Sequence, residues 1–282
     1  MESLYCGPQV LSCGYDKTAR LFDVETVSGM VVQHLELGVC YLGEGNLSCI
    51  LSQDRKSVFP HKNYVTCVQF HPSHPALFLA GTFKSSILCW DRRTGSVAST
   101  YSTLFGQVQD MAFLPGAEEF ISAAEVVRRN LTDKGIMVWD FRSTAVLSNQ
   151  IYQEAFTCTC LKGLPHESHF MAQSINGDYI ALFSTRKPYK LNKFKIYEGH
   201  KPMQQTKQSV AIISFGCDFS PDGKIICSGS ADGKMFFYDH STARVMRTIE
   251  AHSAPCVDVA YDPTLPSWVA TCGWDVQVKV WT

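Results

Sequence analysis

Gly199-His200, Phe219-Ser-Pro-Asp-Gly223, Cys227-Ser-Gly-Ser-Ala-Asp232 and Tyr238-Asp239 follow one another near the end of this 282-residue chain. The chain then repeats the series as Ala251-His252, Tyr261-Asp-Pro263, Thr271-Cys-Gly-Trp-Asp275 and Trp281-Thr282. A repeat of this length indicates one supersecondary unit that recurs along the chain, with neighbouring copies stacked so that they bury a common core.

Each copy of the unit contains three short strand signals separated by turns. The first strand ends in an aromatic residue followed by any residue and proline, which has no N–H to donate and so ends the pairing. The Asp232-Gly233 pair suits the tight hairpin between the second and third strands. The third strand ends in an aromatic residue, at Phe22, Trp90, Trp139, Phe183, Tyr238 and Trp281. The runs are too short for helices, and the sequence therefore predicts an all-β fold.

The spacing of the third-strand ends indicates an irregular first part. Asp23 and Asp91 are 68 residues apart, whereas a unit of this kind takes about 40–45 residues. The sequence predicts an insertion at 27–57, and a degenerate unit in that stretch is the alternative. The first unit, which begins at Gln9, has no first strand before it, and the last unit stops at its third strand. We expect one domain over residues 1–282, with about five whole units and an N-terminal fragment; whether this ring closes stays open.

Composition excludes several classes of protein. Hydrophobic residues make up 45% of the chain and charged residues 18%, so a large core is possible and disorder is not expected. The net charge of −1 gives no global attraction to nucleic acid or to an anionic membrane. No membrane span and no signal peptide are predicted. The 12 cysteines form no Cys-x-x-Cys pair, which indicates a reduced, intracellular protein.

The repeat resembles the WD40 family, whose blades surround a central channel. Further residues resemble one branch of that family, WD repeat-containing protein 25 and its relative pre-mRNA-processing factor 17. They are Ser148-Asn-Gln-Ile151, Phe156-Thr-Cys158, Tyr179-Ile-Ala-Leu-Phe-Ser184, Tyr197-Glu-Gly-His-Lys201 and Ala270-Thr-Cys-Gly-Trp274. The resemblance covers roughly 60–282 and 9–26 and is lost over 27–57. It implies a WD40 β-propeller that has seven blades in the full-length family, and it favours the nucleus over the cytoplasm.

The resemblance also assigns a structural tetrad, in which a buried network of polar side chains fixes each blade. The last blade matches it completely with His252, Thr271, Asp275 and Trp281, and the preceding blade matches it with His200, Ser228 and Asp232. A set of Ser, His and Asp residues also suggests a hydrolase triad. The set recurs at the same offsets in successive units, however, and catalytic sets do not recur in this way. The other blades lack a full tetrad, and we expect them to rely on apolar packing.

No cofactor or metal site is predicted. The pairs His71/His74 and His166/His169 have metal-like spacing, but they fall at turns and lack further ligands at suitable positions. One cluster remains as a candidate contact with RNA or a partner protein. Its residues are Arg186, Lys187, Tyr189, Lys190 and Lys193. Cations interleaved with aromatics can hold phosphates and stack bases, and the alternative is a solvated outer strand with Lys193 and Lys195 on one face and Phe194 and Ile196 on the other.

The sequence therefore predicts a non-catalytic scaffold for protein–protein interactions. The alternative, which rests on resemblance alone, is a component of a pre-mRNA splicing assembly that meets RNA only as part of a complex. We expect other proteins as partners, and neither a membrane nor a small-molecule substrate.

Overall fold

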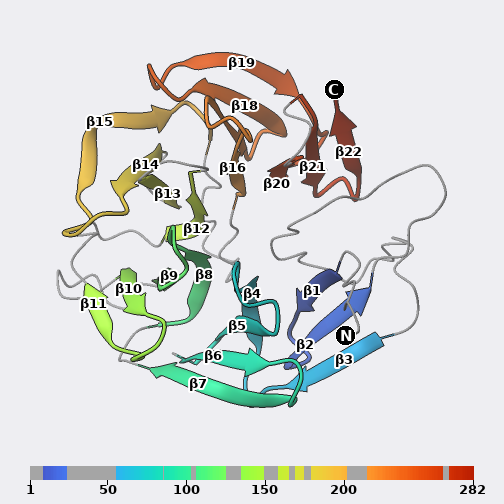
Figure 1. Cartoon of the computed structure of the whole chain (residues 1–282). Helices are drawn as coiled ribbons and strands as arrows, with labels where there is room; N and C mark the ends of the chain where they lie inside the picture. The colour runs from blue at the N-terminus through green and yellow to red at the C-terminus, as the bar shows by residue number, and fades with distance from the viewer. Residues whose placement is uncertain are drawn as a thin grey trace, which may run out of the picture.

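The computed structural model describes residues 9–23, 55–84, 86–102, 106–124, 135–148, 158–164, 169–174, 179–201, 215–262 and 267–282. Every helix or strand in these residues is a β-strand, and the strands form six antiparallel sheets arranged in chain order around a ring (Figure 1). The first and last sheets have three strands and the other four have four. The predicted all-β propeller of repeated blades is confirmed.

Each sheet is made of consecutive strands. The first contains β1 (Gln9–Cys13), β2 (Thr18–Asp23) and β3 (Arg55–Pro60). The second contains β4 (Val65–Phe70), β5 (Leu77–Thr82), β6 (Ser86–Asp91) and β7 (Ser96–Ser102). The third contains β8 (Val108–Phe113), β9 (Glu119–Ala124), β10 (Ile136–Asp140) and β11 (Val146–Ser148).

The second half of the ring continues in the same order. The fourth sheet contains β12 (Cys158–Gly163), β13 (His169–Ser174), β14 (Tyr179–Ser184) and β15 (Leu191–Glu198). The fifth contains β16 (Cys217–Phe219), β17 (Ile225–Gly229), β18 (Lys234–Asp239) and β19 (Val245–Glu250). The sixth contains β20 (Cys256–Tyr261), β21 (Val269–Gly273) and β22 (Val278–Trp281).

The first sheet is completed across the long segment that follows β2. β3 pairs with β2, with Ala19 opposite Phe59 and Arg20 opposite Val58. Residues 55–57, the end of the predicted insertion, therefore belong to this sheet, while residues 24–54 lie outside the described residues. Among the described residues the sheet has no strand on the inner side of β1. The prediction of an insertion at 27–57 is therefore wrong for 55–57; for the rest of that stretch an insertion stays a prediction, with a degenerate blade as the alternative.

Both faces of the four middle sheets are buried, because each of them lies between two others. On β9, Ile121 and Ala123 pack against the fourth sheet, while Phe120 packs against the second. Successive side chains of a strand point to opposite faces, so a strand buried on both sides needs a continuous apolar run. The pattern Glu119-Phe-Ile-Ser-Ala-Ala124 supplies that run.

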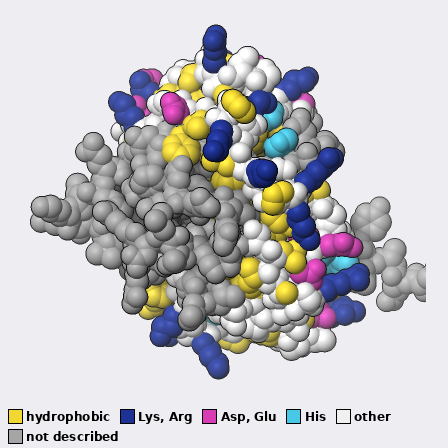
Figure 2. Space-filling view, turned by 90° about the vertical axis from the view of Figure 1, so that its left-hand side faces the viewer, with side chains coloured by type: hydrophobic (Ala, Val, Ile, Leu, Met, Phe, Trp, Pro, Cys, Tyr) yellow, Lys and Arg dark blue, Asp and Glu magenta, His cyan; other side chains and the backbone are white. Residues whose placement is uncertain are grey.

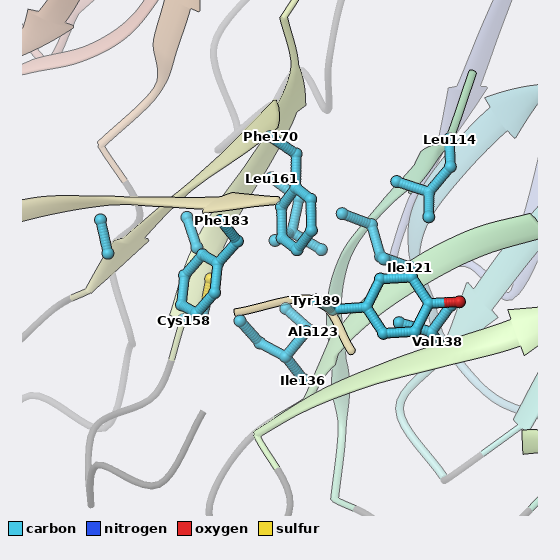
Figure 3. Close-up of a cluster of buried hydrophobic side chains, with 12 residues drawn as sticks. Leu114, Ile121, Ala123, Ile136, Val138, Cys158, Leu161, Phe170, Phe183 and Tyr189 are labelled. Carbon is cyan, nitrogen blue, oxygen red and sulfur yellow. The ribbon is translucent and has the colours of Figure 1, made fainter. Parts of the chain in front are cut away.

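Apolar clusters join neighbouring sheets in the described part of the chain. Figure 3 shows the cluster between the third and fourth sheets, where Ile121 and Val138 meet Leu161, Phe170 and Tyr189. Phe170 is fully buried, and burying such a side chain contributes about 1.5–3 kcal/mol. Similar clusters lie between each other pair of consecutive sheets, so each of the four middle blades is held by two neighbours.

The first and last sheets stand apart in the ring (Figure 1). The last sheet ends at β22, where Val278 and Val280 each keep 59% of their surface exposed. On interior sheets the corresponding third strands are covered, as at β10, whose first four residues are buried. The last sheet thus presents an apolar face and an unpaired edge among the described strands.

Candidate functional site

The tetrad of the last sheet forms one connected network. His252 Nδ1 lies 2.8 Å from Asp275 Oδ1, and His252 Nε2 lies 2.9 Å from Thr271 Oγ1. The Trp281 indole N–H donates to the same Thr271 oxygen at 3.0 Å. Thr271 is buried on β21, and it receives one hydrogen bond and gives another. The structure therefore brings together the four residues that the sequence analysis assigned to one tetrad.

The donors of this network point in one direction. Trp281 donates to Thr271, the threonine hydroxyl donates to His252 Nε2, and His252 donates from Nδ1 to Asp275. Burial raises the pKa of Asp275, but hydrogen bonds from His252 and from the Ser253 amide outweigh it and hold the pKa below its ordinary value. Every polar atom of the series has a partner, so the network fixes the blade geometry.

The same network leaves no nucleophile free for hydrolysis. The hydroxyl of Thr271 is already committed to His252, and only 1% of Thr271 is exposed. A nucleophile must reach a substrate atom while its base holds its proton. A structural role for this set stays our prediction.

The fifth sheet holds only part of the tetrad pattern. His200 Nδ1 lies 3.2 Å from the Tyr238 hydroxyl, and Ser228 donates to the Gly229 carbonyl at 3.0 Å. Asp232 accepts a hydrogen bond from the Ser230 hydroxyl at 2.7 Å, so its carboxylate ties the hairpin turn. Burial lowers the pKa of His200 to about 4, so its imidazole stays neutral near pH 7.

Two earlier blades keep a polar bond that the sequence did not indicate. Trp90 Nε1 donates directly to His61 Nε2 at 2.9 Å, across the place where Ala80 stands instead of serine. Trp139 Nε1 donates to Ser122 Oγ at 2.8 Å. The expectation that these blades rely on apolar packing alone is therefore wrong. Each buried indole N–H finds an acceptor because an unpaired one would cost about 1–3 kcal/mol.

The inner strands carry a charged cluster that sequence reasoning missed. Asp110 on β8 accepts the backbone N–H of Leu161 on β12 at 2.7 Å. Asp218 on β16 accepts the backbone N–H of Tyr261 on β20 at 2.9 Å. Each carboxylate thus bonds to the inner strand of the following sheet. The available signal was a single charged residue within an otherwise apolar inner strand.

Lys162 on β12 is the cation of this inner cluster. Burial lowers its pKa, but the nearby carboxylates Asp218, Asp258 and Asp110 outweigh that effect and raise it. Burial raises the pKa of Asp110 and of Asp258 to about 6. The positive charge of Lys162 therefore offsets the free-energy cost of burying several carboxylates close together.

In the cluster predicted to contact RNA or a partner protein, one side chain is buried and the others are exposed. Tyr189 is 2% exposed and belongs to the core between the third and fourth sheets, and its hydroxyl donates to Glu119 Oε2 at 2.8 Å. Lys187 Nζ lies 3.5 Å from Glu119 Oε1 of the neighbouring sheet. Arg186, Lys190 and Lys193 are exposed. Tyr189 therefore offers no ring for base stacking.

The alternation predicted for the outer strand β15 is wrong. Its pairing with β14 shifts register, because Ala181 lies opposite Ile196 while Phe183 lies opposite Leu191. The extra residues bulge outward and leave Phe194 97% exposed beside Lys193. Figure 2, which faces the side of the ring that carries β11 and β15, shows lysine and arginine side chains among hydrophobic ones. Arg186, Lys190 and Lys193 are the exposed cations of this part of the rim, and Phe194 is its most exposed aromatic ring among the described residues.

The described residues hold no group of three or more His, Cys, Asp or Glu side chains suited to a metal ion. His71 Nδ1 accepts the backbone N–H groups of Ser73 and His74 at 3.1 and 3.0 Å, so this ring caps a turn. His166 lies outside the described residues. Nor do those residues contain a helix with the length and hydropathy to cross a membrane.

Comparisons with known proteins agree with this geometry. The family model described as "WD domain, G-beta repeat" matches residues 53–91, 192–239 and 243–282. WD repeat-containing protein 25 of Mus musculus is 35% identical over 276 residues, which are 98% of this chain and 45% of that protein. Pre-mRNA-processing factor 17 of Homo sapiens is 26% identical over 279 residues, which cover 98% of this chain and 41% of that protein.

The protein of the same name from Saccharomyces cerevisiae is 27% identical over 267 residues, which cover 93% of this chain and 50% of that protein. The chain thus spans half or less of the length of these curated relatives. The repeat matches and the ring of antiparallel sheets lead to one conclusion: the chain carries WD40 repeats and has a β-propeller fold, and it is similar to WD repeat-containing protein 25 and pre-mRNA-processing factor 17.

Proposed function

We propose that this chain is a non-catalytic propeller that docks other proteins on its turns and outer rim. The observation that carries the proposal is the exposure of large aromatic side chains on separate blades. Tyr15, Phe194 and Trp274 keep 62%, 97% and 48% of their surface exposed. Aromatic side chains contribute a large share of the binding energy when an interface buries them, so these exposed rings are suited to contact partner proteins.

A non-catalytic role is supported by the state of the polar groups that recur in the repeat. His252 and Thr271 are buried and bonded to each other, and His200 is buried against Tyr238. Such groups lie within blades, where no substrate reaches them. The exposed turns, in contrast, are free to differ from blade to blade, as binding loops on a rigid scaffold do.

The test is proximity labelling and affinity purification of the tagged chain from cells, beside the tag alone. A folded chain should recover a reproducible set of proteins at near-stoichiometric amounts. The control is the variant Asp275→Ala, which removes the acceptor of the tetrad histidine and should lower both stability and recovery. A folded wild-type chain that recovers nothing above the tag would contradict the scaffold role.

A second candidate function is membership of an RNA-processing assembly in the nucleus. Two observations favour it: the similarity to proteins named pre-mRNA-processing factor 17, and the exposed cations around Phe194. In this role RNA is met only within a complex. Replacing Lys190 and Lys193 with glutamine should lower co-purification of spliceosomal RNA and reduce the salt dependence of RNA binding. Unchanged RNA recovery, or a strictly cytoplasmic chain, would rule this function out.

A further inference from the structure

Three aromatic side chains meet on the surface where the first two sheets join. Tyr15 lies between β1 and β2, Tyr64 between β3 and β4, and Phe83 between β5 and β6. The ring centroids of Tyr15 and Tyr64 are 5.2 Å apart, and those of Tyr64 and Phe83 are 6.0 Å apart. The three residues are 62%, 38% and 45% exposed in chain order. We call these three residues the aromatic patch.

The aromatic patch stands on connections that are bonded to one another. The backbone N–H of Val65 donates to the Gly14 carbonyl at 3.3 Å, and that of Phe83 donates to the Tyr64 carbonyl at 3.0 Å. These bonds join the turn of the first sheet, the connection to the second sheet and the turn of the second sheet. A surface ordered before binding loses less entropy when it binds.

The fold itself does not require aromatic residues at these turns. Tyr15 and Phe83 occupy the position just after the second strand of the unit, two residues beyond Cys13 and one beyond Thr82 respectively. Ala231 holds the matching position in the turn between β17 and β18, and that hairpin forms equally well. Large exposed rings at two neighbouring turns are therefore extra to the needs of the hairpins.

The three connections that carry the aromatic patch also carry lysine residues. Lys17 Nζ lies 5.8 Å from the centre of the middle tyrosine ring, which is within range of a cation–π contact. Lys62 and Lys84 are exposed in the same connections. The carboxylate of Asp16 in the first turn is bonded to the Arg20 guanidinium, which offsets its charge. The surroundings of the patch are therefore positive and favour an anionic partner.

We propose that the aromatic patch docks an acidic peptide segment of a partner protein, which seats one apolar or aromatic side chain against the rings and pairs its carboxylates with Lys17, Lys62 and Lys84. This inference rests on the proposed docking function and specifies the chemistry of one partner. The rings meet at interplanar angles of 67° and 74° and form one continuous apolar surface. Successive nucleic-acid bases instead need separate open ring faces for stacking, and Lys17 occupies one face of Tyr64.

The experiment selects a displayed library of random short peptides on the full chain. The enriched peptides should carry an aromatic or leucine residue flanked by Asp and Glu. Measured by fluorescence anisotropy, their affinity should fall about tenfold or more for Phe83→Ser and for Tyr15→Ser. Lys17→Gln should weaken binding and reduce its dependence on salt. The matched control is Phe194→Ser, which removes a more exposed ring from another blade and should leave the affinity unchanged.

Three results would overturn the proposal. They are a selection without acidic enrichment, peptides that bind Phe83→Ser as tightly as wild type, and a patch that binds oligouridine but no peptide. The cellular experiment separates this proposal from the broader docking function. If Phe83→Ser recovers the same proteins as wild type, the scaffold stands and the patch proposal fails. If wild type itself recovers no partner, the docking function fails.

Discussion

Replacing Thr271 with valine tests the buried network of the last sheet without changing the shape of the side chain. Valine keeps the branched Cβ and suits a β-strand, so packing on β21 should persist. It removes the hydroxyl that donates to His252 Nε2 at 2.9 Å and accepts from Trp281 Nε1 at 3.0 Å. The measured loss of stability therefore reports the two hydrogen bonds.

The magnitude follows from the burial of the two groups left behind. The His252 side chain is 0% exposed, so its free nitrogen loses a partner with no water to replace it, at a cost of about 1–3 kcal/mol. Trp281 is only half-buried, and its N–H should cost about 1 kcal/mol because water reaches it. The expected loss is therefore about 2–4 kcal/mol.

The assay is urea unfolding followed by tryptophan fluorescence and circular dichroism, with the slopes of the transitions compared between variants. Trp281→Phe should cost less than Thr271→Val, because the threonine still bonds to His252. Thr248→Val on the exposed face of β19 is the matched control and should lie within about 0.5 kcal/mol of wild type. If Thr271→Val is as stable as this control, the network does not contribute to stability and the reasoning fails.

Three further substitutions probe other parts of the ring, each by urea unfolding. Burial lowers the pKa of His200 to about 4 from 6.5, so the unfolded state takes up the proton first. The free energy of unfolding should therefore be unaffected by this group above pH 6.5 and should fall by about 2–3 kcal/mol as the pH drops towards 4. His200→Gln should flatten this part of the plot of stability against pH, and an unchanged plot would refute the assignment. Lys162→Met should lower the free energy of unfolding by about 2 kcal/mol at pH 8 and by less at pH 5, because Asp110 and Asp258, with pKa values of about 6, are protonated there. The control Lys193→Met should leave stability unchanged, and equal losses at both pH values would contradict the charge argument. Gly229→Ala should cost about 1–3 kcal/mol because its Cβ meets the backbone of the next sheet, while Gly14→Ala, with ordinary space, should be tolerated; similar stabilities would exclude the clash.

The sequence was sufficient for features that local chemistry controls. The turn at Ser220-Pro-Asp-Gly223 forms as expected, with the Gly223 N–H bonded to Ser220 O at 2.8 Å and a positive φ of 69° at the glycine. The tetrad of the last sheet was assigned by the resemblance to the WD40 repeat, which Thr271, Asp275 and Trp281 match at fixed offsets. Both features depend on residues that recur at fixed spacing, so one copy of the unit predicts the next.

The sequence was insufficient where the register changes. Lysine and aromatic residues alternate along 193–196, which predicts opposite faces for a regular strand. The shift opposite Ala181 and Phe183 breaks that alternation and exposes Phe194. Tyr189, in the turn before β15, has a positive φ of 57° and is buried. Neither feature has a composition signal, since both follow from how β15 meets β14.

Contacts between sheets were also beyond the sequence. The direct bond from Trp90 to His61 depends on the space left by Ala80 between them. The carboxylate of Asp110 finds its partner N–H on Leu161, far along the chain and on the next sheet. Such pairs are determined by the stacking of whole blades, which no single repeat encodes.

The separation of the first and last sheets has a mechanical consequence. In a closed ring, a rotation at one seam must be cancelled by rotations at the others, so the whole stays stiff. In this arrangement the described sheets are linked in series, and each seam is one apolar cluster between two blades. Small rotations at successive seams therefore add. Over the described sheets alone, these rotations sum between the first sheet and β22 (Figure 1), and a ligand in contact with both would oppose them.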